Sequence, residues 1–206
     1  MIKAEGVANI DFIKASKLQF DPLPQMGKIF VDGFYELGLK FISNDKAKLA
    51  RGLSHIFQLD DFYVVIDGGK IAALTGCYDG KSPIIIMFNK KIMRKEMGFF
   101  LGSFAYLMLN KVMGGHKYPF EFTPQTGAIE FVAVSEDYRG RGIGGDLINH
   151  IMENETYAEY VLEVADNNTP AVKLYKKLGF VEFMRTPAPK RSGFSEYVYM
   201  RKVRRK

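Results

Sequence analysis

The sequence contains only one cysteine, Cys77, so no disulfide can form within the chain. Such a composition is typical of a protein from a reducing compartment, and we expect a cytoplasmic location. No apolar stretch of the secretory type follows Met1. The most apolar run, residues 97–109, is shorter than the roughly eighteen residues that a membrane span requires. The sequence therefore predicts no membrane partner.

Basic residues spread over one face are also lacking. The chain of 206 residues has a formal net charge of +6, and a short run near its end supplies most of that excess. This run consists of Arg201, Lys202, Arg204, Arg205 and Lys206. Nucleic-acid binding proteins instead distribute Lys and Arg over a surface, with aromatic residues between them. We interpret the run as a solvated tail and expect no nucleic-acid partner.

A metal-ligand pattern is absent as well. His55, His116 and His150 lie far apart in sequence and have no ligand spacing with one another or with Cys77, so we expect no metal site. Only His116 lies in a loop where it could border a substrate. No repeat, low-complexity tract or Pro/Ser-rich linker divides the chain. Its length and composition therefore predict a single domain over residues 1–206.

Two helices are predicted near the start of the chain. Asp21 to Pro24 offers an N-cap with prolines in the first turn, and the apolar residues that follow recur at helical spacing. We expect Gly27 and Gly33 to interrupt this helix. Asn44–Asp45 predicts the cap of a second helix, which should end near the acidic pair Asp60–Asp61.

A hairpin and a long apolar helix come next. Strands at 63–66 and 71–77 flank Asp67 to Lys70, where two glycines supply the positive φ of a tight turn. The helix is expected over 90–113, and its middle, residues 97–109, is apolar on every side, so it must be covered. It is either buried between the sheet and its neighbours, or it forms the wall of an acceptor pocket or a homodimer interface.

The second half of the chain predicts strands alternating with helices. Residues 128–134 form an apolar strand that contains one charged residue, Glu130. The elements expected after it are a helix at 142–154, a strand at 160–164, a helix at 170–178, and strands at 181–184 and 197–203. Together these elements predict an α/β fold, in which helices cover both faces of a mixed sheet.

A glycine-rich turn leads into the helix at 142–154. The first N–H groups of a helix lack internal partners and lie at the positive end of its dipole, so a glycine-rich entry lets a phosphate approach them. Arg139 and Arg141 add positive charge there. The glycines alone are also compatible with an ordinary turn.

The same glycines fit a dinucleotide fingerprint. Gly140, Gly142 and Gly145 have its spacing, and acidic residues follow about twenty residues later, at Glu163 and Asp166. In that fold, however, the glycines follow the strand at once, whereas here residues 135–139 intervene. Too few strands remain afterwards for a doubly wound sheet. A P-loop is excluded because no Gly-Lys-Ser/Thr follows.

These residues resemble the GCN5-related N-acetyltransferases, the GNAT family. Residues 139–144 match the family signature of Arg or Gln, two residues, Gly, one residue, and Gly or Ala. The second half of the family pattern is matched by Leu162, Glu163, Val164, Asn168, Ala171, Leu174, Tyr175, Leu178, Gly179 and Phe180. The resemblance covers about 128–180, and residues 1–127 carry no recognised motif. It implies a mostly antiparallel sheet that splays at its central strands.

The resemblance also implies acetyl-CoA as the acyl donor, held by residues 128–180. In the family, the pyrophosphate lies on the glycine turn and the pantetheine pairs with the edge of the preceding strand. The positions that match the turn are Arg139, Gly140, Arg141, Gly142, Ile143 and Gly144. The matching strand positions are Val132, Ala133 and Val134. Asn168 matches the asparagine through which the family contacts the cofactor.

The implied reaction needs a base, because an alkylamine is almost wholly protonated at neutral pH. Glu130 is the candidate, since family members often carry a base here and two-residue periodicity places it on one face with Val132 and Val134. The alternative is a glutamate that simply meets solvent. Tyr175 matches the family tyrosine that protonates the departing thiolate. The alternative is a core tyrosine.

The sequence thus predicts an N-acetyltransferase that moves an acetyl group to a primary amine. The acceptor, a small molecule or a peptide, is not specified by any pattern. We expect residues 1–127 to shape the acceptor side, and residues 181–206 to provide the last strands and the basic tail. The alternatives are a non-catalytic acyl-CoA-binding or sensing module and a dinucleotide-binding oxidoreductase.

Overall fold

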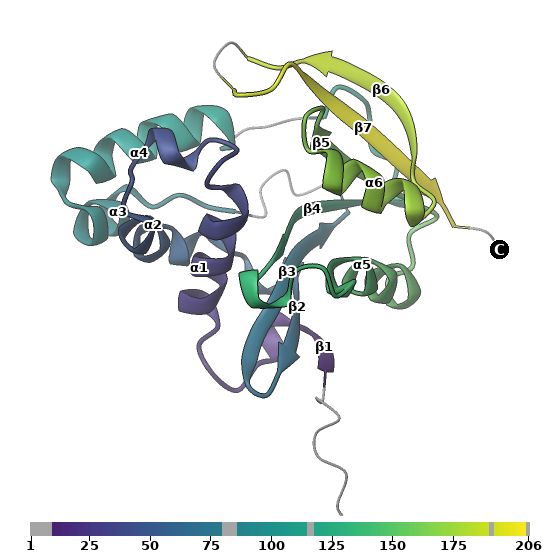
Figure 1. The fold of residues 1–206 in the computed structure, drawn as a ribbon, viewed down its shortest axis with the longest axis horizontal. Helices are drawn as coiled ribbons and strands as arrows, with labels where there is room; N and C mark the ends of the chain where they lie inside the picture. The colour runs from purple at the N-terminus through teal and green to yellow at the C-terminus, as the bar shows by residue number, and fades with distance from the viewer. Residues whose placement is uncertain (1–9, 80–85, 115–117, 190–191, 205–206) are drawn as a thin grey trace, which may run out of the picture.

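The computed structural model describes residues 10–79, 86–114, 118–189 and 192–204, and its centre is a seven-stranded sheet in the order β1-β2-β3-β4-β5-β7-β6 (Figure 1). The strands are β1 Ile10–Lys14, β2 Phe62–Asp67, β3 Lys70–Tyr78, β4 Thr126–Val134, β5 Glu159–Ala165, β6 Val181–Pro187 and β7 Glu196–Val203. All neighbours are antiparallel except β4 and β5. The predicted mixed, mostly antiparallel sheet is confirmed, although sequence analysis missed β1.

Helices cover both faces of the sheet, as predicted (Figure 1). They are α1 Leu23–Phe34, α2 Lys46–Leu53, α3 Lys90–Met97, α4 Phe99–Val112, α5 Ile143–Asn154 and α6 Thr169–Lys177. Alternation along β2 separates the two cores, since Val64 packs with α1 to α4 and Val65 packs with α5 and α6. No helix in the described ranges is long and apolar enough to cross a bilayer.

The two glycines of α1 do not interrupt that helix, contrary to the sequence prediction. Both allow a neighbour to approach closely. A Cβ on Gly27 would lie 2.7 Å from the carbonyl oxygen of Ala50 on α2, and one on Gly33 would lie 3.1 Å from the Cβ of Ala133 on β4. The glycines therefore seat α1 against α2 and against the sheet.

The second helix begins where the sequence predicted but ends earlier. Asp45 caps α2 by accepting a hydrogen bond from the backbone N–H of Lys48. The α-helix stops at Leu53 and a 3₁₀ turn over Ser54–Ile56 follows it. The hairpin of β2 and β3 is confirmed, with positive φ at both glycines of its turn.

The predicted helix over 90–113 is two helices, α3 and α4, which meet at Gly98. Gly98 has a φ of 89°, so the chain turns there and α4 packs back against α3. The inner face of α4 is buried at Gly102, Ala105 and Leu109. Its outer face is exposed, so the prediction that this segment is covered is wrong within the chain.

Because α3 and α4 pack closely at Gly102, we expect a single methyl group at this position to lower the stability of the protein. A Cβ on Gly102 would lie 2.3 Å from the backbone oxygen of Met93, which cannot move without shifting α3. We expect Gly102→Ala to lower the free energy of unfolding by about 1–3 kcal/mol in urea titrations. Gly52→Ala is the matched control, because its Cβ would meet only the flexible side chain of Met97. Equal losses in both variants would contradict this reading.

Candidate functional site

The central feature of the site is the early end of pairing between β4 and β5. The two strands pair only from Thr126 with Glu159 to Ile129 with Leu162. Beyond Ile129, β4 remains paired with β3, and β5 remains paired with β7 as far as Ala165. Within the described residues, the last part of β4 thus presents a strand edge that has no partner strand. This is the splay at the central strands that the family resemblance implied.

A β-bulge in β4 lies directly at this splay. Leu74 pairs with Ala133 and Gly76 pairs with Glu130, so two residues of β4 lie opposite Thr75 alone. Phe131, at the bulge, has a φ of 56°, which non-glycine residues rarely adopt. The hydroxyl of Thr75 donates a 2.9 Å hydrogen bond to the carbonyl oxygen of Glu130, which holds the bulge in place.

The bulge places residues of β4 that lie before and after it on opposite faces of the sheet, although their spacing would otherwise put them on one face. Val132 and Val134 lie against the first turn of α5, where a Cβ on Gly144 would be 3.9 and 3.1 Å from their side chains. Glu130 lies on the opposite face, where Tyr78 donates a 3.1 Å hydrogen bond to its carboxylate. The prediction that Glu130 shares a face with these valines is therefore wrong, because two-residue periodicity fails across a bulge.

The direction of the backbone groups on β4 follows from one hydrogen bond. The N–H of Ser135 donates to the carbonyl of Ala72 on β3, at 2.8 Å. Because successive residues of a strand point their backbone groups to opposite sides, those of Val134 and Val132 point away from β3 and those of Ala133 point toward it. The 3.2 Å hydrogen bond from Arg139 Nε to the carbonyl of Val134 agrees with this assignment.

The glycine turn combines two kinds of glycine. Gly140 and Gly142 have φ values of 77° and 83°, which a side chain would strain. Gly144 and Gly145 instead allow close packing, since a Cβ on Gly145 would lie 3.2 Å from Leu174 of α6. Gly142 is the N-cap of α5 and provides no side-chain cap. The N-terminus of α5, where the first N–H groups lack partners within a helix, therefore has no hydrogen bond from a capping side chain.

Both arginines of the turn contact the protein itself. Besides the bond to Val134, a terminal nitrogen of Arg139 lies 3.4 Å from the carbonyl oxygen of Asp32, at the end of α1. The guanidinium of Arg141 stacks over Tyr138, 5.1 Å from the ring centre. Arg139 thus connects β4, the turn and α1. Sequence analysis assigned it a charge and a place in the phosphate-binding turn, but no contact within the protein.

Asn168 and Tyr175 lie at the two ends of α6. Asn168 is the N-cap, and its side-chain oxygen accepts a hydrogen bond from the N–H of Ala171. Tyr175 is buried in the core beneath α5 and α6, beside Phe180. Burial raises the pKa of the Tyr175 phenol, so it carries its proton throughout the neutral range. Tyr175 and Glu130 therefore belong to opposite faces of the sheet.

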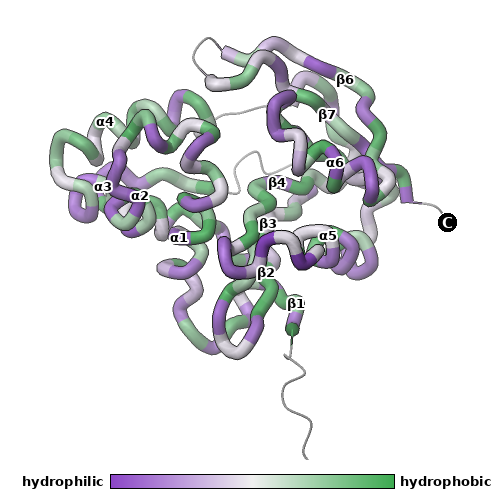
Figure 2. The backbone as a smooth tube through the Cα atoms, in the orientation of Figure 1, coloured by the Kyte–Doolittle hydropathy of each residue, from purple (hydrophilic) through white to green (hydrophobic). Residues whose placement is uncertain are grey.

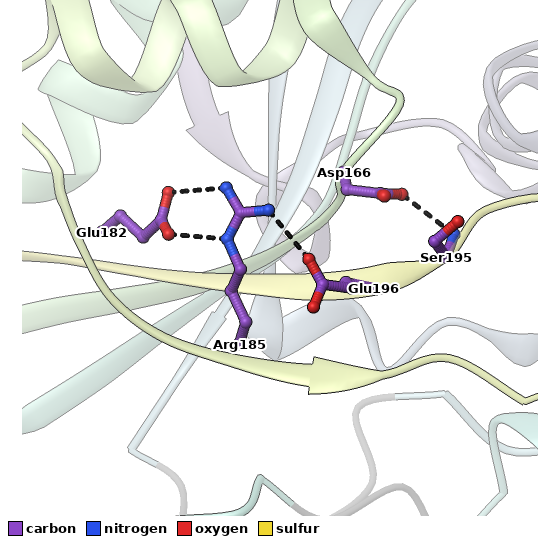
Figure 3. A network of polar contacts seen from close by, with 5 residues as sticks. All are labelled: Asp166, Glu182, Arg185, Ser195 and Glu196. Carbon is purple, nitrogen blue, oxygen red and sulfur yellow. Dashed lines mark hydrogen bonds and ion pairs between the residues drawn. The ribbon is translucent and has the colours of Figure 1, made fainter.

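The loop that carries Asn168 lies against the β6–β7 hairpin, which holds an ion-pair network of its own (Figure 3). Arg185 of β6 forms two hydrogen bonds with Glu182, at 2.7 and 3.1 Å, and one with Glu196 of β7 at 2.9 Å. Asp166 accepts from the N–H of Ser195 at 3.1 Å. The Asp166 contact holds the end of β5 against the β6–β7 hairpin, and the Arg185 ion pairs lie within the hairpin itself. The carboxylate of Asp166, which the dinucleotide alternative required for a ribose, is engaged here.

Sequence analysis missed the aromatic surroundings of Glu130. In the segment after α4, every second residue from 118 to 122 is aromatic. The rings of this segment pack with aromatic rings of β6 and β7 in one cluster, on the face of the sheet that bears Glu130. Its members are Tyr78, Tyr118, Phe120, Phe122, Phe183 and Tyr199. The aromatic residues at every second position, 118, 120 and 122, were the sequence pattern that could have predicted this cluster.

Glu163 is the second carboxylate of this region. It follows Leu162, the last β5 residue paired with β4, just as Glu130 follows Ile129. Burial first, and then the charge of Glu130, raise the pKa of Tyr78 and of Tyr118. The charge of Glu163 contributes to both shifts. Both carboxylates therefore act on the same phenols at the start of the splay.

The histidines take structural positions where the structure describes them. His55 Nε2 accepts a hydrogen bond from the N–H of Asn89, and burial lowers the pKa of this imidazole. His150 stacks on Phe12 at 5.1 Å. His116 lies outside the described residues. In the described ranges, no group of three or more His, Cys, Asp or Glu residues is arranged to hold a metal ion.

Curated relatives match the chain over only part of its length. A mycothiol acetyltransferase of Corynebacterium aurimucosum is 42% identical over 67 residues, which are 31% of this chain and 22% of that protein. An N-alpha-acetyltransferase of Sulfurisphaera tokodaii is 47% identical over 60 residues, which are 27% of this chain and 36% of that protein. The match therefore spans well under half of either relative.

Solved structures match nearly the whole chain. A Pyrococcus horikoshii protein has a TM-score of 0.58 at 20% identity, covering 96% of this chain and 99% of its own. An N-acetyltransferase of Staphylococcus aureus has a TM-score of 0.57 at 21% identity, covering 93% and 100%. These similarities show the fold, and the mostly antiparallel sheet, in which only β4 and β5 pair in parallel, excludes a doubly wound dinucleotide fold.

Residues 44–180 match the family model described as acetyltransferase (GNAT) family. This segment contains the hairpin, the splayed strands, the glycine turn and α6. The chain therefore belongs to the GNAT family of acetyltransferases.

Proposed function

We propose that this protein transfers the acetyl group of acetyl-CoA to a primary amine of a small molecule or a peptide. The observation that carries the proposal is the edge of β4 beyond Ile129, which has no partner strand among the described residues and leads directly to the first turn of α5. An extended amide chain that ends in phosphates fits this arrangement. The strand edge offers hydrogen bonds to the amides, and the helix end favours the phosphates.

The residues that match the family's donor site have different proposed roles. Val132 offers its backbone N–H and carbonyl to the pantetheine, whereas Ala133 directs its own groups toward β3. The carbonyl of Val134 lies on the same edge and accepts the hydrogen bond from Arg139 Nε, which holds the strand end beside the turn. The pyrophosphate would lie over the N–H groups of Ile143 and Gly144. The remaining members of the donor site are Gly140, Arg141, Gly142 and Asn168.

The proposed reaction is a direct attack. Acetyl-CoA supplies an activated thioester. The amine nitrogen forms the new bond to the acetyl carbon as the carbon–sulfur bond breaks. Glu130 accepts the proton that the amine loses, and Tyr175 donates a proton to the departing thiolate. The phenol carries the proton that this step needs at neutral pH, but burial raises its pKa and makes it a weaker acid, so the role rests on the match of Tyr175 to the family tyrosine.

The proposed acceptor site is the face of the sheet that bears Glu130. The aromatic cluster and Glu163 lie there, and α1 borders the end of β4 on the same face. We propose that residues 1–127 shape this side while residues 128–180 hold the donor, within one domain. The names of the relatives, mycothiol acetyltransferase and N-alpha-acetyltransferase, support both a small molecule and a peptide α-amine as the acceptor class.

The proposal is tested by acetyl-CoA turnover. We expect thiol release, measured with a thiol reagent, from acetyl-CoA in the presence of one or more members of a panel of peptide and small-molecule amines. Binding of acetyl-CoA is measured in parallel by calorimetry. No heat of binding at high micromolar protein would reject the donor. Binding of acetyl-CoA without turnover on any amine would instead support the alternative of a non-catalytic sensing module.

Glu130→Gln tests the base. The amide keeps the size of the side chain but cannot accept the proton, so we expect kcat to fall about 100-fold or more. The acidic limb of the pH–rate profile should disappear, while acetyl-CoA affinity stays unchanged. Glu153→Gln, an exposed glutamate on α5, is the matched control. A pH profile that keeps its acidic limb would assign the base to another group.

Tyr175→Phe tests the acid. Removal of the hydroxyl should lower kcat about 10-fold or more and leave the dissociation constant of acetyl-CoA within about twofold. Tyr160→Phe is the matched control, because Tyr160 is a buried tyrosine whose hydroxyl bonds only to the carbonyl oxygen of Glu155. Equal losses of affinity and rate in Tyr175→Phe would indicate a packing role instead.

A further inference from the structure

The outer face of α4 carries the largest group of exposed apolar side chains on one described element. Figure 2 shows the helix as a largely hydrophobic tube at the edge of the molecule. The group consists of Phe99 (61% exposed), Phe100 (86%), Phe104 (47%), Leu107 (61%), Met108 (42%) and Val112 (53%). We name these six residues the α4 face. A soluble monomer rarely exposes so many large apolar side chains together.

The helix that bears this face is held firmly in place. Its inner side packs against α3 through Gly102, where any side chain would collide with the backbone of Met93. The guanidinium of Arg94 lies over the ring of Phe99 at 4.4 Å and donates a 2.8 Å hydrogen bond to the hydroxyl of Ser103. The α4 face therefore cannot turn inward without breaking the contact between α3 and α4.

The size of the α4 face matches one half of a protein interface. At about 200 Å² for a large side chain, the exposed fractions sum to roughly 700 Å². Two such faces together would bury about 1,400 Å², and stable interfaces bury about 1,200–2,000 Å². We propose that the α4 face binds the α4 face of a second copy of this chain, so that the protein is a homodimer.

The pattern of residues on α4 favours a second copy as the partner. Phe100, Phe104 and Leu107 follow one another at intervals of four and three residues, which is the spacing of a helix–helix seam. No charged residue occurs between Phe99 and Asn110, and the one charged residue of α4, Lys111, lies in its last turn at the end of the face. A two-fold axis would let each face serve as its own partner. The pairing is independent of the proposed acetyl transfer.

The experiment measures the mass of the full chain in solution. We expect light scattering after size exclusion to give twice the chain mass, and sedimentation velocity to give a concentration-dependent monomer–dimer equilibrium. Leu107→Glu should weaken self-association by about 30-fold or more, the effect expected for an interface hot spot. Val181→Glu is the matched control, since Val181 is an exposed valine (66%) on β6, on the other side of the molecule. It should leave the mass unchanged.

Two further measurements keep the test decisive. Circular dichroism and acetyl-CoA binding show whether Leu107→Glu remains folded, which distinguishes loss of the interface from loss of structure. A mixture of Leu107→Glu and Leu107→Lys should recover dimers that neither variant forms alone. A wild-type chain that is monomeric at 100 micromolar would overturn the proposal. So would co-flotation of the monomer with anionic vesicles through this face, since that would assign it to lipid.

Discussion

The bulge in β4 is the constraint on which the rest of the site depends. It places two residues opposite Thr75, turns Glu130 toward Tyr78, and leaves Val132 and Val134 facing α5. Without it, alternation along β4 would continue and Glu130 would face the same side as the valines. One irregular residue, Phe131 with its φ of 56°, thus separates the face proposed for the amine from the edge proposed for the donor.

The same irregularity explains what the sequence could and could not predict. The central strand, the glycine turn and α6 were predictable because each carries a local signal: an apolar run, positive-φ glycines, and an Asn cap followed by Pro. The facing of Glu130 was not, because a bulge depends on the register between β3 and β4. Register is a property of two strands far apart in sequence, and no single strand records it.

The apolar segment after Gly98 shows a different limit. Its composition predicted that this segment is covered, yet the chain covers only the side with Gly102, Ala105 and Leu109. A hydrophobic pattern reports how much surface avoids water, but it does not say whether the same chain or another one provides the cover. The break at Gly98 was also not predicted, since a glycine within an apolar run is often accommodated in a helix.

Arg139 joins the two halves of the proposed site. Its guanidinium contacts the carbonyl oxygens of Val134 and Asp32, so the end of β4, the glycine turn and the end of α1 share one side chain. Gly33 brings α1 to within van der Waals contact of Ala133 at the same place. A ligand that displaced Arg139 from Val134 would therefore loosen the contact with α1 as well. The strand end proposed to hold the donor and the helix that borders the proposed acceptor face are thus linked through one side chain.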